Sequence, residues 1–293
     1  TVNRTPLRMI ELGRYIYCII EAEGPKAFGP HGIAEHPEDL PQLPELYTVN
    51  DQHVAVVVSP SPVIEYPVTR EYSMIHQRAI ERVMQEHDVL PVRFCTIAHT
   101  EEQIVTQVLK PRHEEFMQEL AKIKGKQEIS VKAYWLDMKQ IFQEIFEQTE
   151  ELKRLKSAMS GVRPEAAHYD LIDGGRIVQR RLGETREADQ QKLLKALEPL
   201  AVESRTNRVY GETMVANIAF LIENDKEEAF HQAVSTLQED MAGRMNLKYI
   251  TGAPPFNFVT IVIHFDDPDK ATAAESIPQG RQKHEEARRD VPT

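Results

Sequence analysis

The first hundred residues alternate between short apolar runs and one amphipathic stretch. The earliest run is apolar at every position, which is typical of a strand buried on both faces. Between residues 72 and 87, apolar side chains recur at helical spacing and predict a helix with one buried stripe. A loop rich in proline and glycine, 21–45, follows the first strand. The strands predicted in this half are Tyr15–Ile20, Leu46–Val49, Val54–Val58 and Val92–Ile97.

This order, with four strands and one helix before the last strand, is that of a split βαβ or ferredoxin-like unit whose first helix is replaced by the loop. The second half repeats the order. A helical hairpin at about 138–200, with a break at Asp173-Gly174-Gly175, fills the first helix position, and a helix from Asn224 fills the second. The strands predicted there are Ile129–Trp135, Val202–Asn207, Met214–Ile222 and Phe256–Phe265.

We therefore expect an α+β fold of two modified ferredoxin-like (split βαβ) domains, the second with an inserted α-helical hairpin. The N-terminal α+β domain is placed at 1–110 and the C-terminal one at 111–265. Residues 266–293 carry seven acidic side chains against five Lys/Arg and almost no large apolar one. Such a segment cannot bury enough surface to offset its ordering entropy, so we expect a flexible tail.

Charge and cysteine content exclude several classes of protein. The net charge is −11, which argues against an electrostatic grip on nucleic acid or on an anionic membrane. Cys18 and Cys95 both lie in predicted strands, too far apart and too few for a disulfide framework or a thiolate metal site. Apolar runs stay well short of the ~20 residues of a membrane span, and the first residues lack a signal-peptide core. The sequence predicts a soluble, cytoplasmic protein.

Catalytic motifs are missing from the sequence. We find no phosphate-binding loop, nucleophile elbow, H-E-x-x-H or C-x-x-C pattern. His76 and His87 lie on the buried stripe of one helix, too far apart to share a metal without another element. We therefore predict no catalytic, cofactor-binding or metal-binding residues and no enzyme activity. Because ferredoxin-like domains host many functions, a small-molecule-binding regulatory module is the alternative.

Segments in a fixed order resemble the gas vesicle protein F/L family. Tyr15–Tyr17 and Leu90–Thr96 come first, and the latter is similar to the family's L-P-[VL]-R-F-G-T. Val131–Trp135 resembles the strand V-K-[VA]-[YF]-[WY]. Pro199–Arg205 is followed by Tyr249–Val259, which is similar to T-G-P-W-P-P-Y-[NS]-F-V. The similarity covers roughly residues 14–265.

Three departures from the family pattern concern local contacts and leave open whether the chain is an F or an L paralogue. Cys95 stands where glycine is usual. Ala253 replaces an expected Pro-Trp pair. Asp173-Gly174-Gly175 interrupts a region that should be helical.

The resemblance implies a non-enzymatic, two-domain protein that binds the small hydrophobic major gas vesicle shell protein during vesicle formation. Other gas vesicle accessory proteins are further candidate partners. It also implies a cytoplasmic location in association with gas vesicles. Whether the protein is an assembly accessory or a minor component of the vesicle stays open.

Three groups of residues are candidates for partner binding. Arg93, in the middle of a predicted strand, either organises a partner contact or pairs with a carboxylate of its own domain. Tyr134 and Trp135 either contact a partner or are aromatics of the core and its rim. The proline pair fixes φ and lowers the entropy lost on binding, or only sets the entry to a strand. The candidates are Arg93, Tyr134, Trp135, Pro254, Pro255 and Phe256.

Overall fold

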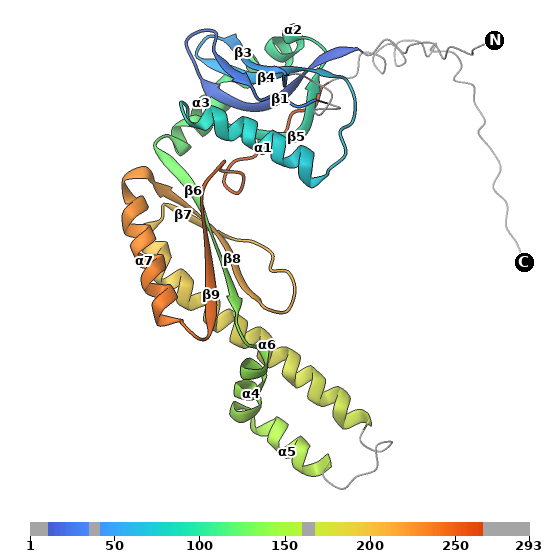
Figure 1. Cartoon of the computed structure of the whole chain (residues 1–293), viewed down its shortest axis with the longest axis vertical. Coiled ribbons are helices and arrows are strands. Elements are labelled where there is room, and N and C mark those ends of the chain that lie inside the picture. Colours follow the sequence, from blue (N-terminus) through green and yellow to red (C-terminus); the bar gives the residue numbers. More distant parts are fainter. Residues whose placement is uncertain (1–10, 35–41, 160–167, 266–293) are drawn as a thin grey trace, which may run out of the picture. The chain divides into compact units, whose positions relative to one another are not determined.

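Antiparallel sheets of five and four strands form the framework of the chain (Figure 1). The computed structural model describes residues 11–34, 42–159 and 168–265. The strands of the first sheet are β1 (Leu12–Glu21), β2 (Ala27–Pro30), β3 (Glu45–Asp51), β4 (Val54–Pro62) and β5 (Leu90–Ala98). The strands of the second sheet are β6 (Lys126–Trp135), β7 (Glu203–Thr206), β8 (Met214–Glu223) and β9 (Met245–Ala253).

Helices connect and cover these strands. None of those in the described ranges combines the length and apolarity that a membrane span requires. Those of the first half are α1 (Arg70–Met84), α2 (Glu101–Ile104), the π-helical turn η2 (Val105–Leu109) and α3 (His113–Ile123). Those of the second half are α4 (Met138–Gln148), α5 (Glu150–Met159), α6 (His168–Leu197), η3 (Glu198–Leu200), η4 (Asn224–Lys226) and α7 (Glu227–Asp240).

Both sheets have the ferredoxin-like strand order. The first runs β2-β3-β4-β1-β5 and the second β7-β8-β6-β9, so in each the first and third strands of the split βαβ unit are neighbours. In the first unit a loop carrying the extra edge strand β2 replaces the first helix, and α1 precedes the last strand. In the second, α4–α6 and α7 fill the two helix positions. The predicted α+β fold of two modified ferredoxin-like domains is confirmed.

The first sheet forms because β1 is apolar on both faces. Its side chains from Tyr15 to Ile20 are completely buried, between β4 on one side and β5 on the other. The amphipathic stripe of α1 packs on the sheet through His76, Ala79, Ile80 and Val83. Strand β2 was not predicted, because proline and glycine dominate the loop that contains it.

A large bulge interrupts β5. Ile16 pairs with Thr96 and Cys18 with Pro91, so one residue of β1, Tyr17, lies opposite four residues of β5. Cys95, inside the bulge, has a φ of 61°, a left-handed conformation that costs an ordinary residue roughly 1 kcal/mol and glycine nothing. The glycine that the F/L family usually has at this position therefore suits the backbone better than cysteine does.

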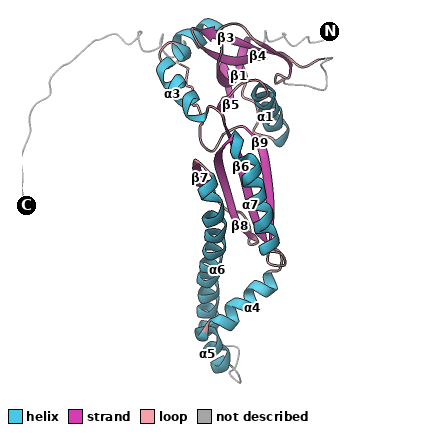
Figure 2. Cartoon of the chain, turned by 90° about the vertical axis from the view of Figure 1, so that its left-hand side faces the viewer, coloured by secondary structure: helices cyan, strands magenta, loops and turns pink. Residues whose placement is uncertain are grey.

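The second sheet packs its alternating apolar face against α6 and α7. Ile129, Val131, Ala133 and Trp135 of β6 belong to this core. Helices α4 and α5 run beside α6 (Figure 2), which makes the predicted hairpin. The break predicted at Asp173-Gly174-Gly175 is wrong, because α6 continues through these residues as one helix. Two glycines cost a helix about 2 kcal/mol in propensity, which its other contacts outweigh.

The last predicted strand, Phe256–Phe265, is wrong. The fourth strand of the sheet is β9, in which exposed and half-buried side chains alternate and which therefore gives a weaker apolar signal. The apolar residues after it pack elsewhere: Phe256 joins the core of the first sheet, and Val259 and Ile261 are buried.

Two sets of contacts cross the domain boundaries predicted from the sequence. Helix α3, in the segment assigned to the second domain, packs against β1, β4 and β5. The segment 254–262, which we call the strap, returns to the first sheet, where Ile261 forms a bridge with Val92. The compact unit that includes both sheets ends at Val262. The predicted tail, 266–293, lies outside the described residues.

Candidate functional site

Arg93 lies on the bulge of β5 with an exposed side chain. Its backbone N–H donates to the carbonyl oxygen of Ile261 at 3.0 Å. Within the described parts of the chain its guanidinium makes no ion pair, so the carboxylate partner considered from the sequence is not found there. Arg93 is therefore accessible to another molecule, while its backbone holds the strap.

Tyr134 and Trp135 point to opposite faces of the second sheet, as successive strand residues must. Trp135 is 3% exposed, and its indole N–H donates to Oδ2 of Asp189 at 2.9 Å. Tyr134 is half-buried on the other face, with Nζ of Lys248 5.1 Å from its ring centroid. The two aromatics predicted as one contact surface are thus separated by the sheet.

The carboxylate of Asp189 joins the helical hairpin to the second sheet. It is 1% exposed and accepts from Lys192 and, at 2.9 Å, from Nε of Arg244, which also donates to Glu144 of α4 at 2.6 Å. Burial opposes ionisation of Asp189, but hydrogen bonds from Lys192 and Trp135 and the charge of Arg244 hold its pKa below the ordinary value. This network fixes the root of the hairpin and leaves Trp135 no role at the surface.

The Pro254-Pro255-Phe256 loop is occupied by its own chain. Both prolines are buried, and Phe256 packs on the core of the first sheet with its ring centroid 6.5 Å from that of His76. The rigid loop therefore already binds a surface, and that surface belongs to the first domain. A role for these three residues in binding a separate partner stays a prediction.

Asn257, the next residue of the strap, forms hydrogen bonds through both its backbone and its side chain. Its backbone N–H and its Nδ2 donate to the two carboxylate oxygens of Glu128 at 2.9 and 2.5 Å. Its Oδ1 accepts from Asn207 at 2.9 Å, and its carbonyl oxygen accepts from Nη1 of Arg205 at 2.6 Å. Glu128 is 2% exposed, and burial raises its pKa despite the two donors of Asn257 and the charge of Arg205.

The strap ends on the edge of the first sheet. Ile261 lies beside Val92 in parallel, and its N–H donates to the carbonyl oxygen of Pro91 at 3.0 Å. Arg112, immediately before α3, donates to the carbonyl oxygen of Val262 at 2.9 Å. These main-chain contacts close the edge of β5. Neither Asn257 nor Glu128 was predicted from the sequence: the only local signal of Asn257 is its place between two aromatic residues, and Glu128 has none.

A hydrogen-bond relay holds the bulge of β5 from inside. Nε2 of His76 donates to the carbonyl oxygen of Val92 at 3.2 Å, and Nδ1 then accepts from the hydroxyl of Tyr15 at 3.1 Å. The same hydroxyl accepts the N–H of Cys95 at 2.9 Å. Burial lowers the pKa of His76 to about 4, so the imidazole is neutral near pH 7. Because His76 is 3% exposed, the relay is structural.

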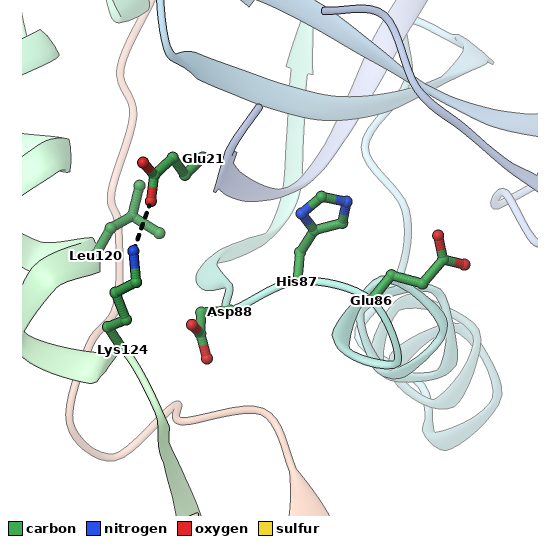
Figure 3. A pocket seen from close by; sticks show the side chains of 6 residues that line it. All are labelled: Glu21, Glu86, His87, Asp88, Leu120 and Lys124. Carbon is green, nitrogen blue, oxygen red and sulfur yellow. Dashed lines mark hydrogen bonds and ion pairs between the residues drawn. The ribbon is translucent and has the colours of Figure 1, made fainter. Parts of the chain in front are cut away.

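A hollow of about 190 Å³ beside α1 gathers several charged side chains (Figure 3). Lys124 pairs there with Glu21 at 3.4 Å, whereas Glu86 and Asp88 point in other directions. The carboxylates do not converge on one point. Across the residues that the structure describes, no three His, Cys, Asp or Glu side chains are grouped as a metal ion would require. The hollow offers no arrangement suited to catalysis.

Comparison with known proteins gives consistent matches. The family model described as gas vesicle synthesis protein GvpL/GvpF matches residues 13–260. Gas vesicle protein F of Nostoc sp. is 28% identical over 199 residues, which cover 67% of this chain and 80% of that protein. Gas vesicle protein F of Microcystis aeruginosa is 23% identical over 86% of this chain and 99% of that protein.

Solved structures share the fold. The crystal structure of the gas vesicle protein GvpF from Anabaena sp. superimposes with a TM-score of 0.73 at 25% identity, over 85% of this chain and 98% of that one. The corresponding structure from Microcystis aeruginosa gives a TM-score of 0.69 at 23% identity, over 84% and 98% of the two chains. With a family model that spans both of its domains, the chain belongs to the gas vesicle synthesis protein GvpL/GvpF family.

Proposed function

We propose that this protein binds the major gas vesicle shell protein during vesicle formation and keeps it competent to assemble. The observation that carries the proposal is the match of a gas vesicle family model to residues 13–260, across both domains. The proposal places the protein in the cytoplasm in association with gas vesicles. Other gas vesicle accessory proteins are further candidate partners.

The physical properties of the chain suit such a task. A shell subunit that will line a gas space exposes apolar surface before it polymerises, and such surface aggregates in water. A partner that covers this surface for a time, while its own net charge of −11 keeps the complex dispersed, prevents that aggregation. Neither step requires a catalytic group.

We also propose that the protein is not an enzyme. Several of its strongly perturbed titratable groups are enclosed: Tyr17 and Cys18 are completely buried and His76 nearly so. Each is held or surrounded by core side chains rather than facing a substrate-sized cavity. Two hollows of the described chain are lined mainly by polar and charged side chains, unlike the apolar pockets that bind most small ligands.

Among the six residues predicted to bind a partner, we propose two roles. Arg93 and Tyr134 offer side-chain surface to a partner. The other four residues stabilise the fold and do not contact the partner. Trp135 holds the root of the helical hairpin through Asp189, and Pro254, Pro255 and Phe256 hold the strap on the first domain.

Co-expression with tagged shell protein, followed by affinity capture, tests the proposal. We expect stoichiometric capture by the wild-type chain and loss of soluble shell protein when this chain is omitted. Arg93→Ala and Tyr134→Ala, compared with Arg78→Ala on the exposed side of α1, separate the two domains as binding surfaces. No capture, together with normal vesicles in a deletion strain, would refute the proposed function.

A further inference from the structure

The face of the second sheet that is turned away from α6 and α7 carries a basic row. In the antiparallel ladder, Lys132 of β6 lies directly opposite Asn217 of β8 on one side and Lys248 of β9 on the other. Directly opposed residues project from the same face. The row one step further along β6 contains Tyr134 and, opposite it, Asn246.

This row is unusual for so acidic a chain. Like charges placed directly opposite each other destabilise a sheet, yet Lys132 and Lys248 are cross-strand partners in a protein of net charge −11. Neither forms an ion pair with any residue that the structure describes. Nζ of Lys248 instead lies over the ring of Tyr134, which is a weak substitute for a carboxylate.

The loop before β8 adds a third cation and a second tyrosine beside the row. Nδ2 of Asn217 donates to the carbonyl oxygen of Arg208 at 3.1 Å, which fixes the loop next to this face. The guanidinium of Arg208 lies 5.6 Å from the ring centroid of Tyr210, and Tyr210 is 65% exposed. Arg208 also has no ion-pair partner in the described ranges.

The strap shows that this face can hold a polypeptide. Arg205 of β7 lies in the row of Ala219 and Ser130, nearer the end of β6 that carries Glu128. It donates to the carbonyl oxygen of Asn257, and its guanidinium lies 5.4 Å from the ring centroid of Phe258. Thus an arginine already holds a backbone carbonyl and an aromatic ring on the covered part of the face.

We propose that the remaining part of this face is a docking surface for a carboxylate-bearing segment of a protein partner. Lys132, Lys248 and Arg208 supply the charge, and Tyr134 and Tyr210 supply apolar contact. An incoming carboxylate between Lys132 and Lys248 converts a repulsive pair into an attractive triplet. The inference deepens the proposed function, on which it rests, by naming the surface and the chemistry that it recognises.

Nucleic acid is the other class of anion that a basic sheet face with tyrosines could take. The net charge of the whole chain disfavours it, because a polyanion is repelled over the rest of the surface. A protein segment carries only a few charges, close to the basic row, and avoids most of that repulsion. The observations therefore favour the protein segment.

The test uses the full chain with two charge reversals, Lys132→Glu with Lys248→Glu. Its matched control is Lys139→Glu with Lys195→Glu, two exposed lysines on α4 and α6 with the same change in charge. One assay measures capture of co-expressed shell protein, and a second measures direct binding of poly-L-glutamate at low salt. We expect at least a ten-fold loss in both assays for the first variant and less than a two-fold change for the control.

The two assays separate the two ideas. Normal capture of shell protein by the Lys132/Lys248 variant overturns the docking surface and leaves the proposed function intact. Poly-L-glutamate binding that the variant loses, with no capture by the wild type, supports the surface and refutes the proposed function. Binding of a single-stranded RNA oligonucleotide in place of poly-L-glutamate would overturn the inference in favour of nucleic acid. If the charge reversals unfold the chain, Lys132→Gln with Lys248→Gln replaces them.

Discussion

Asn257 holds both oxygens of the Glu128 carboxylate, one through its backbone N–H at 2.9 Å and one through Nδ2 at 2.5 Å. Glu128 belongs to β6 of the second domain, and the residues on either side of Asn257 contact other parts of the chain. Phe256 packs on the first core and Phe258 lies under Arg205. A single amide therefore fixes the point where the strap leaves the second domain for the first.

Asn257→Ala removes one of the two donors to a buried carboxylate and its acceptor for Asn207. Because a hydrogen bond to a charged group contributes about 1.5–3 kcal/mol, we expect the free energy of unfolding to fall by about 2–3 kcal/mol. Urea denaturation measures the loss. The control is Asn246→Ala, an exposed position on β9, which should change stability by less than about 0.5 kcal/mol. Equal stabilities for the two variants would contradict the role of Asn257.

The buried carboxyl group of Glu128 should make the stability of the protein depend on pH. Burial raises its pKa in the folded state, so its contribution to stability is full below the ordinary glutamate pKa of about 4.3 and is lost as the pH rises through the raised value. Glu128→Gln cannot titrate. The stability of the variant relative to wild type should therefore increase as the pH rises above about 4. Parallel pH profiles for the two proteins, with the exposed Glu223→Gln as reference, would refute this.

Asp189 is expected to behave in the opposite way. Its pKa is lowered in the folded state, so its stabilisation is present above the ordinary aspartate pKa and is lost as the pH falls through the lowered value. Asp189→Asn should cost about 2–4 kcal/mol near pH 7, because Arg244 and Lys192 lose a buried partner. Trp135, the only tryptophan of the chain, reports the change directly: its fluorescence should shift to longer wavelength in the variant. An unchanged spectrum would count against the network.

The left-handed backbone of Cys95 predicts the ranking of two variants. Cys95→Gly and Cys95→Ala both lose the sulfur that accepts the N–H of Tyr66 at 3.2 Å. They differ at a φ of 61°, which glycine adopts freely and alanine does not. The glycine variant should therefore be more stable than the alanine variant by about 1 kcal/mol. Thermal unfolding of the two proteins decides the point, and an alanine variant of equal stability would contradict it.

Much of the fold follows from local patterns. The apolar run at Tyr15–Ile20, the stripe of α1 and the alternation in β6 each predict an element that the structure contains. The order of these elements then indicates two split βαβ units. The cysteine at position 95, where the family usually has glycine, occupies a left-handed backbone position; the sequence shows the substitution, and only the structure shows the φ of 61°.

Other features depend on contacts that no local pattern reveals. The apolar run after Ala253 predicts a strand, but its side chains are buried by the first domain instead. Edge strand β9 exposes Lys248 and Ile250, so it lacks the signal of a core strand. The pairing of Glu128 with Asn257 joins residues far apart in the chain, and neither residue type is specific enough to suggest the other.

Edge strand β9 carries its own protection. Gln238 of α7 accepts the N–H of Leu247 at 2.7 Å and donates to the carbonyl oxygen of Met245 at 3.3 Å, so it occupies backbone groups that another strand could pair with. Gln238→Ala should increase self-association, detectable by analytical ultracentrifugation as a species larger than that of wild type. Gln232→Ala, on an exposed turn of the same helix, should not. If both variants sediment like wild type, Gln238 has no such role.

The strap has a consequence for the order of events during synthesis. The strands and helices of the first domain are all present once α3 has been synthesised. The edge of β5 and the part of the core that Phe256 covers stay open until residues 254–262 have been synthesised. At translation speeds of about 5–20 residues per second, that interval is on the order of ten seconds. During this time the nascent domain exposes an unpaired strand edge and part of its core. The domain made first is thus the last to be completed, because its earliest sheet is closed only after the whole second sheet has been synthesised.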